Sequence, residues 1–161
     1  MRIGIGYDIH RLAEKTPLIL GGVVIPHNKG LVGHSDGDVL LHAIADSMLG
    51  AAGLQDIGSH FPPTDPTTQG ISSLVILDKL NTLINDKGWR VSNLDATIVA
   101  EKPRLAEYLP LMKERIAGTL GIGIECIGIK AKTNEGLGAE GREEAVTAYA
   151  VTLIIPFPTA S

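Results

Sequence analysis

The chain has 161 residues, a formal net charge of −4 at pH 7 and 44% hydrophobic residues, which suits a single domain over residues 1–161 with its own core. The acidic balance and the 4% aromatic content exclude a nucleic-acid-binding protein of the usual basic kind, and the apolar runs are shorter than the roughly 20 residues of a membrane span. One cysteine, Cys126, and no leader-like opening segment favour a reducing compartment, either the bacterial cytoplasm or the plastid stroma after removal of a transit peptide.

The opening segment, residues 1–7, is predicted to be a strand that closes on an Asp-Ile-His sequence. Gly4 and Gly6 leave room on this strand for another backbone or a ligand to come close. A strand presents residues two apart on one face, so Asp8 and His10 point the same way. A carboxylate and an imidazole on one face form two ligands of a possible metal site.

An apolar run over residues 18–25 is broken by two glycines and predicts a hairpin or a bent strand. A loop over 28–37 then leads to a helix over 38–52. This helix is apolar around most of its circumference, which indicates that it is buried. Ser35 or Asp36 is expected to cap its start.

Polar side chains recur every four residues on this apolar helix, at Asp38, His42 and Asp46. Residues four apart share one helix face. Either carboxylate could accept a hydrogen bond from the His42 ring nitrogen that does not face a metal, although purely structural hydrogen bonding would also explain the stripe. With Asp8 and His10, His42 completes three ligands of an open tetrahedral zinc site whose fourth position is left for substrate or water.

The rest of the chain alternates between helices, strands and polar loops. The segment 56–65 contains two prolines and has an acidic residue at each end, which favours a loop that shapes a site over a solvated turn. We expect, in order, a helix over 72–87, a strand over 90–100, a turn over 101–104, a helix over 108–120, a strand over 127–131, a polar loop over 132–138, a strand over 145–155 and a frayed tail over 156–161.

These elements predict an α+β fold, an α/β sandwich with one mixed β-sheet and helices layered on one face. The strands look apolar on both sides, yet the helices suffice to cover only one. We therefore expect the other sheet face to pack against further copies of the chain in a symmetric oligomer.

Several short motifs occur together in a specific order. They are Asp8-x-His10, His34-Ser35-Asp36-Gly37-Asp38, His42, Asp56-Ile57-Gly58, Phe61-Pro62, Thr64-Asp65-Pro66 and Lys130-Ala131-x-Thr133-x-Glu135. With this combination the chain closely resembles the 2-C-methyl-D-erythritol 2,4-cyclodiphosphate synthase family over nearly its whole length. The resemblance implies a lyase of the methylerythritol phosphate route to isoprenoid precursors. Such an enzyme converts 4-diphosphocytidyl-2-C-methyl-D-erythritol 2-phosphate to the cyclic diphosphate and CMP.

The resemblance also implies roles for particular residues. Zinc would be held by Asp8, His10 and His42, and Glu135 would hold magnesium or manganese, while the positions of His34 and Thr133 are those of transition-state stabilisers. Substrate contacts are implied at Asp8, His10, His34, Ser35, Asp56, Ile57, Gly58, Phe61, Pro62, Pro63, Thr64, Asp65, Lys132, Thr133, Asn134, Glu135 and Arg142. A cytosine pocket is implied at Ala100, Glu101, Lys102, Pro103, Arg104, Leu105 and Ala106. The family is a homotrimer whose sites lie between subunits, with metal ligands from one chain and the cytidine pocket from the next.

Three positions depart from the family pattern. Pro63 stands where Asp is often expected, which removes a carboxylate and a backbone N–H donor from the substrate loop. Lys132 stands where Thr is expected, and its cation could bind phosphate or pair with Glu135. Ala139 replaces an aromatic residue of those members that hold an isoprenoid diphosphate on the trimer axis, which argues against that ligand and leaves Arg142 as an anion-site candidate.

Two other functions are compatible with these ligands. A zinc phosphohydrolase would use His34 as the general base for an attacking water. A trimeric binding protein with a structural metal would need a closed fourth ligand position, for which His27 and His60 are the remaining histidines.

Overall fold

The computed structural model describes residues 1–157, and its centre is a mixed five-stranded sheet with the strand order β4-β1-β7-β5-β6. β5 and β6 are parallel, whereas β1 is antiparallel to both β4 and β7, and β5 is antiparallel to β7. The strands are β1 (Arg2–Glu14), β4 (Lys29–Leu31), β5 (Trp89–Val99), β6 (Ile127–Lys132) and β7 (Ala145–Pro156). The predicted α+β class is confirmed.

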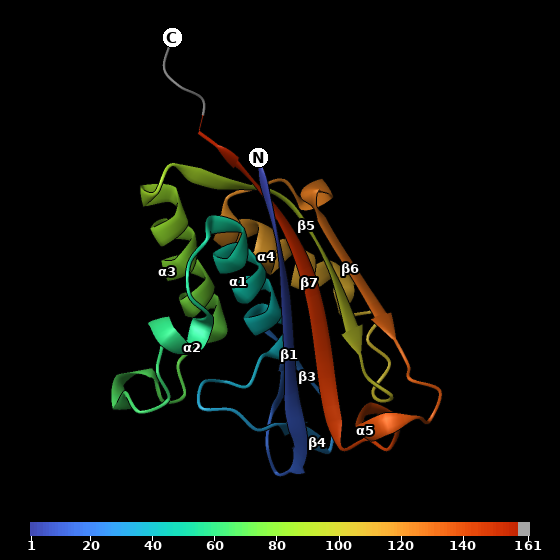
Figure 1. Ribbon diagram of the computed structural model, residues 1–161. Coiled ribbons are helices and arrows are strands. Elements are labelled where there is room, and N and C mark those ends of the chain that lie inside the picture. Colours follow the sequence, from blue (N-terminus) through green and yellow to red (C-terminus); the bar gives the residue numbers. More distant parts are fainter. Residues whose placement is uncertain (158–161) are drawn as a thin grey trace.

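Three helices lie on one side of this sheet. They are α1 (Val39–Ala52), α3 (Ser73–Asp86) and α4 (Leu109–Leu120). In Figure 1, α1 and α4 lie behind the strands and α3 lies to the left of α1. The smaller elements are the hairpin of β2 (Leu18–Leu20) and β3 (Val23–Ile25), the short helices α2 (Ile57–His60) and α5 (Gly138–Gly141), and the 3₁₀ turns Pro66–Thr68 and Ile124–Cys126. Within the described residues, no helix has both the length and the apolar character needed to cross a membrane.

Two glycines of β1 let the backbone of α1 lie directly against the strand. A Cβ atom on Gly4 would be 2.1 Å from the carbonyl oxygen of Ser47, and one on Gly6 would be 1.9 Å from that of Ala43. Real Cβ atoms do not approach backbone atoms so closely. The predicted close approach at both glycines is confirmed, and the approaching group is the backbone of α1.

The opposite sheet face carries exposed apolar side chains. Ile3 and Ile5 on β1 are 69% and 72% exposed, and the ring of Tyr7 packs at a tilt of 51° against that of Tyr149 on β7, with the ring centres 5.1 Å apart. Ile9 and Val151 extend the same exposed face. The helices of the chain leave this face bare, as the sequence predicted.

Several predicted boundaries are wrong. β1 extends to Glu14 because it pairs with β7 as far as Arg11 and then with β4, a strand that lies in the expected 28–37 loop. The 56–65 segment contains α2. The N-cap of α1 is Asp38, whose carboxylate accepts the Leu41 N–H at 3.0 Å, and neither Ser35 nor Asp36 holds that position.

The expected frayed tail over 156–161 is corrected where it can be described. Pro156 is the last residue of β7, and the N–H of Phe157 donates to the carbonyl of Gly88. Residues 158–161 lie outside the described part of the chain.

Candidate metal site and substrate cavities

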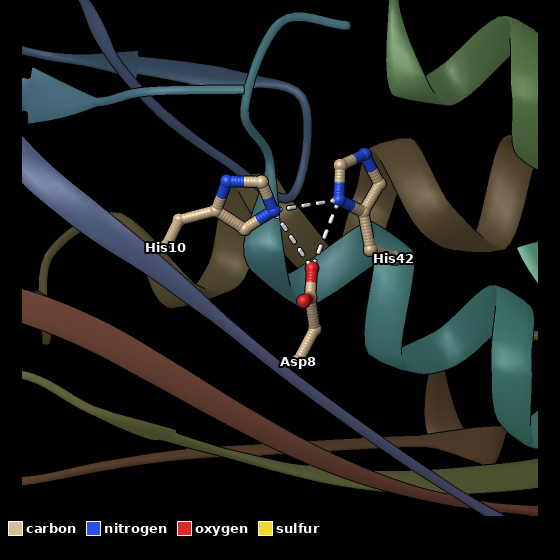
Figure 2. Close-up of side chains that lie close together, drawn as sticks. All are labelled: Asp8, His10 and His42. Carbon is tan, nitrogen blue, oxygen red and sulfur yellow. Dashed lines mark hydrogen bonds and ion pairs between the residues drawn. The ribbon is translucent and has the colours of Figure 1, made fainter. Parts of the chain in front are cut away.

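Asp8 and His10 of β1 and His42 of α1 meet at one point between the sheet and the helix (Figure 2). Asp8 Oδ2 is 2.9 Å from His10 Nε2 and 3.0 Å from His42 Nδ1, and the two histidine nitrogens are 3.2 Å apart. Among the described residues, this is the group of His, Cys, Asp and Glu side chains that could hold a metal ion. The strand alternation and the helical position predicted from the sequence bring the same three residues together.

The spacing of the three ligand atoms fits a small divalent ion of the zinc type. Tetrahedral zinc with bonds of about 2.0–2.2 Å places its ligand atoms roughly 3.3 Å apart. One carboxylate oxygen and two imidazole nitrogens are also the donor set that zinc prefers. His27 and His60 are not in this group within residues 1–157, so the three ligands leave an open fourth position.

Hydrogen bonding fixes which His10 nitrogen faces the centre. His10 Nδ1 is 2.6 Å from the carbonyl oxygen of Val32, which can only accept, so Nδ1 carries the hydrogen. His10 Nε2 is therefore the ligand atom. On His42, Nδ1 faces the centre, and Nε2 lies 2.9 Å from Ser35 Oγ and 3.0 Å from Ser73 Oγ.

The charges at the centre favour a cation. Burial raises the pKa of Asp8, but hydrogen bonds from His10 and His42 outweigh it and bring the pKa down to about 2. Burial lowers the pKa of His10, but its hydrogen bonds to Asp8 and to the Val32 carbonyl raise it above its ordinary value. The carboxylate is thus ionised, and a divalent ion would take the place of the proton that it shares with the imidazoles.

The expected hydrogen bond from His42 to Asp38 or Asp46 is replaced by bonds to the two serines. Asp38 is fully buried and accepts the N–H groups of Gly21 and Gly22 at 3.0 and 2.7 Å, so it holds the β2–β3 turn on the start of α1. Asp46 accepts the Ile57 N–H at 2.8 Å and so attaches α2 to α1.

The three candidate metal ligands line a cavity of about 230 Å³, which we call the metal cavity. Its residues are Asp8, His10, His34, Ser35, His42, Asp46, Ile57, Gly58, Phe61, Thr68, Ile71 and Ile76. His34 and Ser35, and three residues of the predicted 56–65 substrate loop, are therefore gathered beside the three candidate ligands. The three loop residues are Ile57, Gly58 and Phe61, whereas Asp56 and residues 62–65 do not line this cavity.

His34 is held at the rim of the metal cavity. Its Nε2 lies 3.1 Å from Thr68 Oγ1, and the Thr68 hydroxyl also donates to the carbonyl of Asp65. Sequence reasoning missed Thr68, Ile71 and Ser73, which reach the site only through the fold.

Hydrogen bonds to Asp56 and Asp65 hold the chain at the two ends of the 56–65 segment. Asp56 accepts the N–H and the hydroxyl of Ser59 at 2.9 and 2.7 Å, and these bonds lower the pKa of its carboxyl group. Asp65 accepts the N–H and the hydroxyl of Thr67 in the same way, which lowers its pKa. Between these two carboxylates, Pro62 is half-buried, whereas Pro63 and Thr64 are exposed.

A second cavity of about 220 Å³ lies at the ends of β5 and β6. It is lined by Ala100, Glu101, Pro103, Arg104, Leu105, Ala106, Ala131, Lys132 and Thr133. Most of the predicted cytosine pocket and the start of the 132–138 loop are thus side by side. No described residue lines both this second cavity and the metal cavity.

The remaining predicted substrate residues lie around the second cavity. The Asn134 N–H donates to Glu101 at 3.2 Å, and the Thr133 hydroxyl donates to Glu135 at 3.1 Å. Glu135 has a φ angle of 52°, an uncommon conformation for a residue other than glycine and one that clusters at functional sites.

Two predicted substrate contacts, Lys102 and Arg142, form ion pairs within the chain. Lys102 forms an ion pair with Glu143 at 2.8 Å, and Arg142 pairs with Glu144 at 3.1 Å. Neither cation is among the described residues that line the metal cavity or the second cavity.

The chain matches the model of the YgbB family over residues 1–155. It belongs to the YgbB family. Among relatives of this YgbB chain, 2-C-methyl-D-erythritol 2,4-cyclodiphosphate synthase of Thermosynechococcus vestitus is 57% identical over 96% of each chain. The protein of the same description from Clostridium perfringens is 52% identical over 96% of this chain and 99% of its own. The resemblance inferred from the motifs is confirmed.

Solved structures agree with this family assignment. The bifunctional IspDF of Campylobacter jejuni has a TM-score of 0.93 at 37% identity, and the match covers 97% of this YgbB chain and 42% of that protein. A 2C-methyl-D-erythritol-2,4-cyclodiphosphate synthase in a form with CDP bound has a TM-score of 0.88 at 37% identity, with 96% and 100% of the two chains covered.

Proposed function

We propose that this protein converts 4-diphosphocytidyl-2-C-methyl-D-erythritol 2-phosphate to 2-C-methyl-D-erythritol 2,4-cyclodiphosphate and CMP. The observation that carries the proposal is the open Asp8–His10–His42 group at the wall of a cavity. The names of the relatives and the CDP-bound neighbour support the substrate class. A substrate with three phosphate groups needs such a local cation because the protein itself is acidic.

The reaction is an intramolecular phosphoryl transfer. An oxygen of the substrate's 2-phosphate forms a bond to the β-phosphorus, and the bond from that phosphorus to the oxygen bridging it to the α-phosphate breaks, so that CMP leaves with the electron pair. No protein nucleophile is required. The protein has to fold the substrate so that attacking and leaving oxygens are in line and the accumulated charge is offset.

The residues of the metal cavity would position the reacting phosphates. A bound zinc ion would supply Lewis-acid polarisation of a phosphate oxygen. His34, fixed by Thr68, and the Ser35 hydroxyl are donors for phosphate oxygens. Asp56, on the entry to α2, is an acceptor for the hydroxyls of the methylerythritol unit.

The residues of the second cavity would hold the cytidine end. The backbone of residues 100–106 would read the cytosine edge, and Lys132 would offer a cation to the diphosphate. Glu135 would hold a magnesium or manganese ion that is otherwise coordinated by phosphate oxygens and water, as hard cations prefer. Thr133, whose hydroxyl now donates to Glu135, would turn that donor to the substrate.

We further propose a homotrimer in which the metal cavity of one chain faces the second cavity of its neighbour. The exposed apolar face of β1 and β7 supports an assembly, and the two separate cavities support a shared site. Light scattering should give three chains per particle. Mixing inactive His42→Ala chains with inactive Ala106→Tyr chains should restore part of the activity, because some neighbours then pair an intact metal cavity with an intact second cavity.

The deciding experiment follows the products by phosphorus NMR with zinc and magnesium present, with and without a chelator. CMP and a cyclic diphosphate in equal amounts, lost on chelation, support the proposal. Inorganic phosphate in place of CMP would favour a phosphohydrolase, and no turnover would favour a binding protein. His42→Ala should abolish turnover in a folded protein, whereas His27→Ala, a histidine outside the metal group, should retain it.

A further inference from the structure

The far nitrogen of His42 is held by two serine hydroxyls. Ser35 Oγ and Ser73 Oγ lie 2.9 and 3.0 Å from His42 Nε2. Ser73 is 1% exposed and belongs to the first turn of α3. A hydroxyl can either donate or accept, so the serines alone do not determine which ring nitrogen carries the hydrogen.

Asp36 determines the direction of the Ser73 hydroxyl. Asp36 Oδ1 is 2.5 Å from Ser73 Oγ, and Asp36 Oδ2 accepts the Ser73 N–H at 2.9 Å. An ionised carboxylate only accepts, and a hydroxyl has one hydrogen to give. Ser73 therefore donates to Asp36, and its oxygen is left to accept the hydrogen from His42 Nε2.

From this chain of contacts we propose that Asp36 and Ser73 are positioning residues that keep the hydrogen of His42 on Nε2 and so present the Nδ1 lone pair to the metal. The proposal rests on the metal site within the proposed function. It does not depend on which reaction the metal serves. A carboxylate that orients a ligating histidine through an intervening group is a known way to tune metal affinity.

The contacts of Asp36 and Ser73 matter because Asp8 favours the other tautomer of His42, with the hydrogen on Nδ1. Asp8 Oδ2 is 3.0 Å from His42 Nδ1 and would accept a hydrogen from it in the metal-free protein. With Asp36 and Ser73 in place, the hydrogen of the neutral ring is held on Nε2, and the Nδ1 lone pair faces the metal position. Without them, the neutral ring would carry its hydrogen on Nδ1, and the metal would have to change the tautomer as well as bind.

Asp36 also joins the elements that surround the His42 ring. Its own N–H donates to the carbonyl of Ile71 at 3.1 Å, and its carboxylate receives the first N–H of α3. Ser72, the N-cap residue of α3, makes no capping bond with its side chain. Asp36 thus substitutes for that cap, and the loop before α1 and the start of α3 form one wall behind the ring.

Ser35 and Ser73 have different surroundings. Ser35 lines the metal cavity, whereas Ser73 is buried behind the ring and is not among its lining residues in the described chain. If both hydroxyls accept from Nε2, the hydrogen of Ser35 can go either to Ser73 Oγ, 3.5 Å away, or to the contents of the cavity. Ser73 is consequently the better target for a test, since its loss leaves the cavity-lining groups in place.

The experiment compares zinc affinity and the His42 tautomer in Ser73→Ala, Asp36→Asn and the double variant, with Ser72→Ala as the matched control. Affinity is measured against a chromophoric chelator. The tautomer is read in the zinc-loaded protein from long-range ¹H–¹⁵N couplings of labelled histidine. We expect Ser73→Ala and Asp36→Asn each to lose about 10- to 100-fold in zinc affinity. Because the two residues act through one chain of contacts, the double variant should bind zinc no more weakly than the weaker-binding single variant. Ser72→Ala should bind as wild type does, and Ser73→Thr should restore most of the affinity.

The wild-type spectrum should show hydrogen on Nε2 and none on Nδ1. Zinc affinity within twofold of wild type in both Ser73→Ala and Asp36→Asn would overturn the proposal, as would a wild-type His42 that binds zinc through Nε2. Neither readout uses turnover. A protein that shows the expected tautomer and affinities but makes no cyclic product would refute the proposed function alone.

Discussion

Replacing Gly6 by alanine should separate the two elements that share the metal site. The new Cβ would lie 1.9 Å from the carbonyl oxygen of Ala43 and 2.7 Å from the N–H nitrogen of Ser47. Both are backbone atoms of α1, so no rotamer change relieves the clash. Restoring an ordinary C···O distance of about 3.3 Å requires the strand and helix to part locally by more than about 1 Å.

This displacement is large on the scale of metal coordination. His42 adjoins Ala43 on α1, while Asp8 and His10 follow Gly6 on β1. Ligand distances in a metal site are held within about 0.2 Å, so the shift should cost at least about 100-fold in zinc affinity. Overpacking of this kind should also cost about 1–3 kcal/mol of unfolding free energy.

The assay is zinc competition combined with urea unfolding on Gly6→Ala, Gly4→Ala and Gly50→Ala. Gly4 meets α1 at Ser47 and Ala51, farther along the helix from His42, so its substitution should destabilise the fold with a smaller loss of zinc affinity. Gly50 lies within α1, where an added Cβ would be 3.8 Å from its nearest neighbour. Its replacement should leave zinc binding unchanged and raise stability by about 0.5–1 kcal/mol. Zinc affinity of Gly6→Ala equal to that of Gly50→Ala would refute the reasoning.

Three further predictions follow from the described contacts. Burial raises the pKa of Asp38 to about 6, against about 3.9 when unfolded, so stability should fall as pH rises from 4 to 6. In urea unfolding at several pH values, Asp38→Asn should make the free energy of unfolding less dependent on pH. The variant should also lose about 1–3 kcal/mol of that free energy, because a buried backbone N–H is left without an acceptor. Zinc affinity should increase with pH until His10 is deprotonated, because a metal ligand must lose its proton to bind. The hydrogen bond from His10 to a carboxylate outweighs the effect of burial and raises the pKa of His10. Calorimetry in two buffers counts the protons released. Thr68→Val removes the contact that holds His34 and should lower kcat about 10- to 100-fold with zinc affinity unchanged, as steady-state kinetics and zinc titration would show.

The sequence predicts the parts of the site that depend on local periodicity. Asp8 and His10 share a face because a strand alternates, and His42 lies inside a helix whose apolar pattern is unambiguous. The glycines at 4 and 6 indicate a close approach. The family motifs then indicate that the strand and the helix meet.

The same local rule fails for Asp38. Spacing of four places two side chains on one face only when both residues are helical. Asp38 is the N-cap, with a ψ angle of 88°, and its carboxylate turns back over the helix start toward the β2–β3 turn. Asp46 is fully helical, yet the N–H of Ile57 on α2 takes its carboxylate. The spacing of the acidic residues shows neither the β2–β3 turn that binds Asp38 nor the Ile57 N–H that binds Asp46.

Ser73 could not be predicted from any local pattern. It is one serine at the start of an ordinary amphipathic helix, 31 residues from His42 in sequence. Its contact depends on how α3 packs against α1 and on Asp36, a residue that sequence reasoning assigned to helix capping. Such a contact comes from tertiary packing, which residue periodicity does not record.

The long pairing of β1 with β7 has a consequence for the order of events on the ribosome. All three candidate metal ligands leave the exit tunnel early. The strand that fixes Asp8 and His10, through the pairs Asp8↔Ala148 and His10↔Val146, is translated near the end of the described chain. A nascent chain without that strand has the ligands and the helix but no partner along most of β1. Loading of the ion should therefore follow translation of the whole sheet.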